Sequence, residues 1–429
     1  MRRHPIQGLV LAEHEFTVPL DHGQPDGETI TVFAREARAA GSEDADKPWL
    51  VFLQGGPGSP ATRPTGLETW PVRAAKDYHL LLLDQRGTGR STPVMAQTLA
   101  RFGSPAAQAD YLKHFRADSI VRDAELIRAE LAGGERWALL GQSYGGFCTT
   151  TYLSLAPEGV REAYVTGGLP PLDRPADDIY RATYRRVADR NERYYARYPQ
   201  DVDRVKELVD MLGSEEVRFA DGTRLTPRRL LQVGSILGMS YGFEKVHYLI
   251  ELAFVDGVRG REVSSQFLRA VDQQLPFDPA PIYTLLHEAC YAQGEATRWS
   301  AQRILGEFPE FELDGDGPVY FTGEMVYPWM LDEYHELQPL KEAAELLAEF
   351  EEWPRLYDPD RLAENEVPVV AAVYENDMYV KREFSVETAR VLGAKAWVTS
   401  QYEHDALRSW GTEVVSKLFA MRRGEVYAL

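Results

Sequence analysis

The first third of the chain alternates short apolar runs with a segment of helical periodicity. Residues 49–53 and 79–83 are almost entirely apolar, and each run ends in a glycine-rich turn, as strands buried on both faces do. Residues 119–131 carry apolar side chains at helical spacing, and a Gly-Gly pair at 133–134 precedes a further apolar run at 137–140. This alternation predicts a parallel sheet covered by helices.

The pattern becomes mainly helical after residue 168. Residues 205–212 place apolar side chains at i, i+3, i+4 and i+7, and strand-like runs return only at 367–374 and 396–399. We therefore predict an α/β fold in which a helical cap interrupts a mostly parallel sheet and lies over the carboxyl-terminal edge of its strands. The expected division is a first core segment at 1–168, the cap at 169–345 and a second core segment at 346–429.

Ser143 is the predicted nucleophile. Residues 137–146 have the sequence Trp-Ala-Leu-Leu-Gly-Gln-Ser-Tyr-Gly-Gly, in which a strand, a G-x-S-x-G motif and the start of a helix follow one another. This is the nucleophile elbow, where small neighbours relieve the crowding of a turn that exposes the serine hydroxyl above the sheet. The alternative is an ordinary glycine-rich turn between a strand and a helix.

The order serine, acid, histidine, which this elbow favours, selects the other two members of a catalytic triad. Only His404 follows a later strand that ends in an acid, although a surface histidine is the alternative. The strand at 367–374 runs into Glu375 and Asp377, and we favour Asp377 as the acid that orients the imidazole. Glu375 is its rival, and Asp405 is a weaker one because adjacent side chains diverge.

Acyl transfer also needs donors for the oxygen that becomes negative. The amide that follows the serine belongs to Tyr144, and the loop after the first apolar strand offers the amide of Gly56. The Gly-Gly-Pro-Gly sequence at 55–58 lets backbone approach a substrate closely, although an ordinary tight turn has the same composition.

The composition of the chain limits which binding partners and which cellular location we expect. The 429 residues include 47 Lys and Arg against 66 Asp and Glu, a net charge of −19 that repels nucleic acids and anionic membranes. The two cysteines, Cys148 and Cys290, are too few for a disulfide framework or a cysteine-rich zinc site, and we expect no metal. The apolar stretch at 8–12 is shorter than a signal peptide needs, and no run approaches membrane-spanning length, so we expect a cytoplasmic protein.

Three motifs together resemble the proline iminopeptidases, which are also called prolyl aminopeptidases. They are Gln-Gly-Gly-Pro-Gly at 54–58, Asp-Gln-Arg-Gly-Thr-Gly-Arg-Ser at 84–91 and the elbow at 141–146, and the likeness extends through the cap to the C-terminus. Gln54 departs from the pattern, since many members have histidine there, and this puts in doubt any role for that side chain. The resemblance implies an α/β-hydrolase with a large helical cap that needs no cofactor and releases N-terminal proline from short peptides through a prolyl ester on Ser143.

An aminopeptidase must recognise a free terminal amine, which is largely cationic at neutral pH, so a carboxylate is required in the pocket. Glu288 and Glu324 are the candidates, each set among apolar or aromatic neighbours, and Glu244 and Glu295 are weaker ones. The alternative is that these acids are solvated or cap helices. Aromatic side chains of the cap are candidates to line a pyrrolidine pocket or to fill a core: Tyr194, Tyr195, Tyr327 and Trp329.

Two further expectations follow. The Asp84-Gln85-Arg86 turn suggests that Arg86 supports the site structurally, for example by pairing with Asp84. The competing functions are another hydrolase, such as a broader aminopeptidase, amidase or esterase, and a non-catalytic receptor on the same fold. The sequence makes no prediction about oligomeric state.

Overall fold

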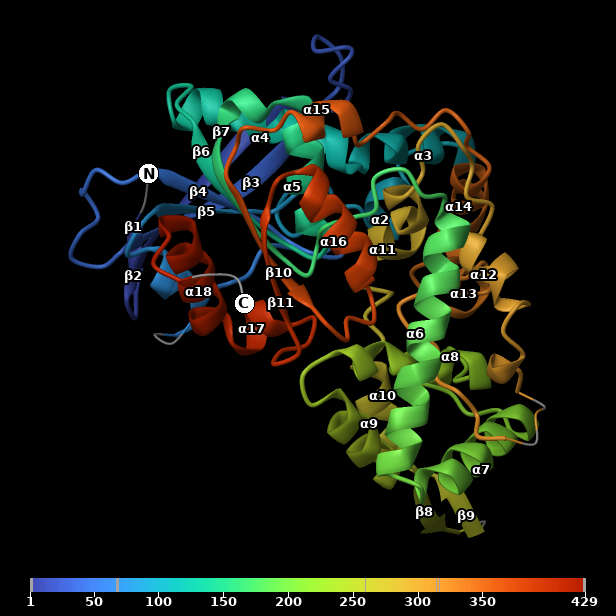
Figure 1. Cartoon of the computed structure of the whole chain (residues 1–429). Coiled ribbons are helices and arrows are strands. Elements are labelled where there is room, and N and C mark those ends of the chain that lie inside the picture. Colours follow the sequence, from blue (N-terminus) through green and yellow to red (C-terminus); the bar gives the residue numbers. More distant parts are fainter. Residues whose placement is uncertain (1–2, 67–68, 259, 314, 316, 427–429) are drawn as a thin grey trace.

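A nine-stranded sheet forms the centre of the computed structural model, which describes residues 3–66, 69–258, 260–313, 315 and 317–426 (Figure 1). Its strand order is β1-β2-β3-β5-β4-β6-β7-β10-β11. The first three strands join the sheet antiparallel, and the other pairs are parallel. The strands are β1 (Arg3–Ile6), β2 (Leu9–Pro19), β3 (Thr29–Ala39), β4 (Trp49–Leu53), β5 (His79–Leu83), β6 (Trp137–Gln142), β7 (Val160–Thr166), β10 (Val369–Tyr374) and β11 (Lys395–Thr399).

Helices cover both faces of the parallel part, which explains its continuous apolar runs: every side chain of β5, β6 and β10 is buried. On one face α1 packs against α18, and on the other α4 packs against α5. The helices that accompany the sheet are α1 (Trp70–Ala74), α2 (Ala96–Leu99), α3 (Pro105–Leu112), η1 (Lys113–Phe115), α4 (Ala117–Leu131), α5 (Tyr144–Leu155), η2 (Pro157–Gly159), α15 (Pro359–Ala363), α16 (Arg382–Val391), α17 (Ala406–Ser409) and α18 (Gly411–Arg423).

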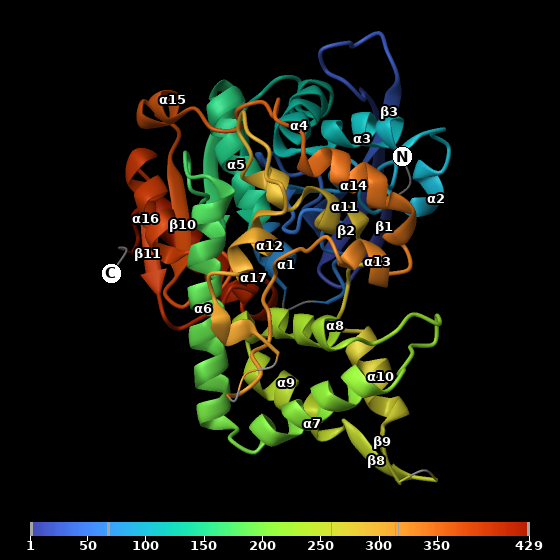
Figure 2. The same ribbon diagram turned by 90° about the vertical axis from the view of Figure 1, so that its right-hand side faces the viewer.

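The chain between β7 and β10 is mostly helical, and its long helix α6 runs from the sheet toward the far end of the molecule (Figure 2). There α7, α9, α10 and the β8-β9 hairpin gather beyond the sheet (Figures 1 and 2). These elements are α6 (Ala176–Arg197), α7 (Asp201–Ser214), α8 (Pro227–Leu231), η3 (Gln232–Gly238), α9 (Gly242–Glu251), β8 (Phe254–Gly257), β9 (Gly260–Val263), α10 (Ser265–Asp272), α11 (Pro281–Leu286), η4 (Glu288–Cys290), α12 (Ser300–Leu305), η5 (Pro309–Phe311), α13 (Met330–Glu333), η6 (Gln338–Leu340) and α14 (Lys341–Ala348). We retain residues 169–345 as the proposed limits of the cap, and α14 extends slightly beyond residue 345.

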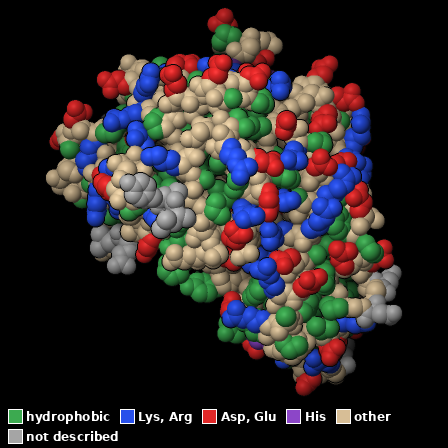
Figure 3. Space-filling model, viewed as in Figure 1, with side chains coloured by type: hydrophobic (Ala, Val, Ile, Leu, Met, Phe, Trp, Pro, Cys, Tyr) green, Lys and Arg blue, Asp and Glu red, His purple; other side chains and the backbone are tan. Residues whose placement is uncertain are grey.

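The surface carries mixed charge. Lys and Arg side chains are interspersed with Asp and Glu over the face seen in Figure 3. Within the described part of the chain, every helix is too short or too polar to cross a lipid bilayer.

Candidate active site

Ser143 lies on the sharp turn between β6 and α5 and has a φ of 55°, a left-handed conformation that non-glycine residues rarely adopt. The close packing around it explains the glycine spacing of the motif. A Cβ at Gly145 would lie 1.8 Å from the carbonyl oxygen of Leu53, and one at Gly141 would lie 2.3 Å from that of Gly145. Neither position accepts a side chain unless the backbone moves.

The structure brings the three predicted triad residues together from three separate loops. His404 follows β11, and its Nε2 lies 2.9 Å from Oγ of Ser143. Its Nδ1 lies 2.8 Å from Oδ2 of Asp377, which follows β10. All three residues stand beyond the carboxyl ends of parallel strands, so the topology of the sheet gathers them. The distance from Ser143 to His404 permits proton transfer to the imidazole, and the contact with Asp377 can orient that ring.

Asp377 is fixed by its own loop. Its Oδ1 accepts hydrogen bonds from the amides of Tyr379 at 2.9 Å and Val380 at 3.0 Å, which leaves Oδ2 for the imidazole. The two rival acids are engaged elsewhere. Glu375 pairs with Arg382, and Asp405 accepts hydrogen bonds from Ser240 and Ser409.

His404 is buried, and burial by itself lowers the pKa of an imidazole because it disfavours the charged form. The charge and hydrogen bond of Asp377 outweigh this effect, and the net pKa of His404 is raised above its ordinary value of 6.5. A raised pKa makes the imidazole a stronger base, which suits removal of the serine proton.

The predicted oxyanion donors flank the serine. Tyr144 is the first residue of α5, where amides have no intrahelical acceptor. Gly56 lines the same cavity as Ser143 and has a φ of +133°, which requires glycine. Gly55 packs directly on the nucleophile, since a Cβ there would lie 2.9 Å from the Cβ of Ser143. The loop thus holds backbone against the reaction centre.

A cavity of about 210 Å³ contains Ser143 and His404, and Glu324 of the cap lies on its wall. His287 Nε2 lies 3.7 Å from Oε2 of Glu324, and the hydroxyl of Tyr283 donates to the Glu324 carbonyl oxygen at 3.1 Å. These neighbours hold the glutamate on the wall of the cavity. The volume of the cavity is below the roughly 300–1,000 Å³ of sites that bind drug-sized ligands, and it suits a single small residue.

The two candidate glutamates are not equivalent, because the structure does not bring Glu288 to this cavity. Both oxygens of Glu288 accept hydrogen bonds at 2.9 Å from the amides of Ser300 and Ala301, at the start of α12. Burial raises the pKa of Glu288 and these amides partly oppose the rise. Of the weaker candidates, Glu244 pairs with Arg197 and Glu295 is exposed.

The aromatic side chains that line the cavity are Phe277, Tyr283 and Tyr379. The tyrosines and tryptophan expected from the sequence lie away from it. Tyr194 hydrogen-bonds Asp201, for example, and Tyr327 contacts Tyr184, so these rings belong to the interior of the cap.

The suggested Arg86–Asp84 pair does not form. Arg86 is buried and binds both oxygens of Asp123 on α4, at 2.5 and 2.7 Å. Asp84 instead binds Arg63 in the loop after β4, with contacts of 2.5 and 2.7 Å. The two side chains therefore support different parts of the structure.

The sequence reasoning missed Arg190 of the cap helix α6. Its guanidinium donates to the carbonyl oxygen of Asn376 at 2.6 Å and binds the carboxylate of Glu403. Asn376 precedes Asp377, and Glu403 precedes His404, so one arginine joins the two loops that carry the acid and the base. A charged residue within the apolar stripe of α6, between Val187 and Tyr194, is the signal that was available.

The sequence reasoning also missed Arg408, which lies on α17 shortly after His404 and lines the cavity. Among the described residues, no group of three or more His, Cys, Asp or Glu side chains is arranged to hold a metal ion. Both cysteines are buried and free.

Comparison with known proteins gives concordant matches. Residues 48–211 match the alpha/beta hydrolase fold family. Over 420 residues the chain is 48% identical to a proline iminopeptidase of Aeromonas sobria, covering 97% of this chain and 98% of that protein. It is 37% identical over 423 residues to the proline iminopeptidase aneH of Aspergillus aculeatus, covering 97% and 94%.

Proposed function

Because the chain belongs to the proline iminopeptidase family of α/β-hydrolases, we propose that it is a serine aminopeptidase that releases N-terminal proline from short peptides. The observation that carries the proposal is the position of Glu324, a cap carboxylate on the wall of the cavity that holds Ser143 and His404. A free terminal amine is cationic at neutral pH, and a carboxylate is its natural partner. A simple esterase has no need of this charge.

In the proposed reaction His404 accepts the hydroxyl proton of Ser143 while Oγ attacks the prolyl carbonyl carbon. Asp377 stabilises the imidazolium, and the amides of Gly56 and Tyr144 donate to the negative oxygen. The carbon–nitrogen bond then breaks, and the imidazolium gives its proton to the leaving amine. Water, activated by His404, hydrolyses the prolyl ester, releases proline and restores the serine hydroxyl.

The first test compares a prolyl chromogenic amide with its N-acetylated form on the purified protein. We expect the free amine to be strongly preferred, and proline to exceed other residues in a panel of aminoacyl amides. Faster turnover of the blocked substrate would refute the aminopeptidase assignment. A fluorophosphonate should label the protein at Ser143 and fail to label Ser143→Ala, a result that separates an enzyme from a receptor.

The second test is Glu324→Gln. Leaving an ammonium without its partner in a largely buried site costs about 3–5 kcal/mol, so amine-dependent turnover should fall by roughly 150- to 5,000-fold while hydrolysis of a simple ester survives. The matched control is Glu342→Gln, which removes one exposed carboxylate from the cap helix α14. Equal losses on both substrates would remove Glu324 from amine recognition.

A further inference from the structure

Arg408 is a cation at the reaction cavity that forms no ion pair in the part of the chain that the structure describes, although the charge of Asp405 lies near enough to interact with it. It is exposed, and its guanidinium makes one long contact, 4.0 Å to Sδ of Met239 in the cap. Its neighbours are different: Arg63 is paired with Asp84, and Arg73 with Asp77. An arginine offers five donors in a planar fork that matches a carboxylate, and those of Arg408 remain available.

Arg408 and Glu324 place opposite charges around one reaction centre. Both line the cavity that contains Ser143. After burial and the hydrogen-bonded Asp377, they are the next charges that act on the pKa of His404, which Glu324 raises and Arg408 lowers. A substrate at Ser143 therefore meets an anion and a cation within the same cavity.

We propose that Arg408 binds the free C-terminal carboxylate of a dipeptide Pro-X while Glu324 binds its ammonium, which makes zwitterionic dipeptides the preferred substrate class. The inference rests on the proposed function and deepens it. A dipeptide carries its two charges on either side of one peptide bond, which is the bond that the serine must attack. Charge pairing at both ends would fix that bond in the cavity and exclude the reversed orientation.

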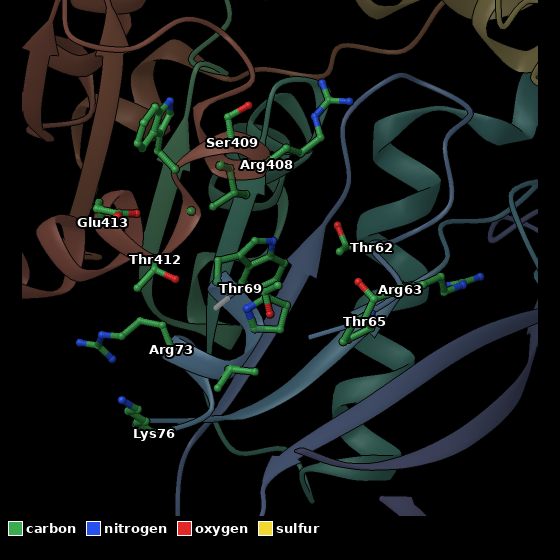
Figure 4. A pocket seen from close by; sticks show the side chains of 17 residues that line it. Thr62, Arg63, Thr65, Thr69, Arg73, Lys76, Arg408, Ser409, Thr412 and Glu413 are labelled. Atoms are coloured by element: carbon green, nitrogen blue, oxygen red, sulfur yellow. The ribbon is translucent and has the colours of Figure 1, made fainter. Parts of the chain in front are cut away.

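A second, larger cavity of about 700 Å³ shares Arg408 with the first and offers room for the side chain of residue X. It is lined by α1, the loop before it and the α17-α18 segment. Figure 4 shows Arg408 on one side of this cavity, with its side chain pointing away from Arg73 and Lys76. We therefore expect a preference for a free carboxylate on X and tolerance of its side chain.

The experiment measures a discrimination factor, the kcat/KM for Pro-Gly divided by that for Pro-Gly amide, in the wild type and in Arg408→Met. We expect the wild type to favour the free carboxylate by roughly 5- to 20-fold, since the partner arginine is exposed and its ion pair is partly screened. Arg408→Met should bring the factor close to one, and Arg408→Lys should restore part of it. High salt should weaken the wild-type preference.

Lys76→Met is the matched control, because it removes an exposed cation from the neighbouring cavity and should leave the factor as in the wild type. A wild-type factor of one, or a factor unchanged in Arg408→Met, would overturn the role of Arg408. Turnover of a prolyl naphthylamide, which has no carboxylate, separates the two hypotheses. If the wild type fails to cleave it, the proposed function itself is refuted.

Discussion

Arg190→Met should remove one of the contacts that join the cap to the two loops carrying the acid and the base. Arg190 is 5% exposed, and its substitution leaves the Glu403 carboxylate and the Asn376 carbonyl oxygen without their donor. Removing one partner of a buried ion pair costs about 3–5 kcal/mol. The Glu403 side chain is 28% exposed, so water recovers part of this loss, and we expect a destabilisation of about 2–3 kcal/mol.

The assay combines urea unfolding with steady-state kinetics on a prolyl chromogenic amide. Because the loops that hold Asp377 and His404 lose a common anchor, we expect kcat to fall by roughly 10- to 100-fold, with a smaller change in KM. Arg185→Met is the control, since it removes the same charge from an exposed position on the same helix. Equal urea midpoints and equal kcat values for the two variants would refute the reasoning.

Three further predictions concern the site and the turn beneath it. The acid limb of kcat/KM should lie above pH 6.5, because His404 must be neutral to act and its pKa is raised; a pH profile checks this, and a basic limb should follow as the substrate amine deprotonates near about 7.7–8.0. Asp377→Asn should lower kcat by about 10⁴-fold and move the acid limb to lower pH, because burial, which lowers the pKa of His404, is then opposed only by the charge of Glu324; an unmoved limb would contradict this. Gly145→Ala should destabilise the fold by at least about 3 kcal/mol in urea unfolding, whereas Gly213→Ala, in open space near the end of α7, should be neutral or stabilising.

The architecture could be predicted from local sequence patterns. A strand that is buried on both faces must be apolar throughout, and the glycines of G-x-S-x-G are required by the crowding around the serine turn. Every apolar run assigned as a strand at 49–53, 79–83 and 137–140 is a strand in the structure. His404 was reached by chain order alone, and its geometry with Ser143 agrees with that assignment.

The roles of the acidic residues in the cap could not be predicted from the sequence, because an acid on a helix has the same local sequence pattern whether it contacts a ligand, a backbone amide or water. Glu288 and Glu324 were indistinguishable in sequence, yet Glu288 accepts hydrogen bonds from the amides that begin α12, whereas Glu324 lines the cavity that contains Ser143. The partners of Arg86 and Arg190 lie 37 and 213 residues away at Asp123 and Glu403. Such pairs depend on tertiary packing, which no local pattern records.

The contacts beside the triad bear on how substrates come and go. Tyr379 donates its hydroxyl to the Ser235 carbonyl oxygen, and Asp405 accepts from Ser240, so η3 and the segment after it are bound to residues next to Asp377 and His404. Because the cap is attached at these points, it cannot move away from the sheet without disturbing the catalytic geometry. Arg408 lines the cavity and is itself exposed, so with the cap held in place the space beside this residue would limit the size of the substrates that reach Ser143.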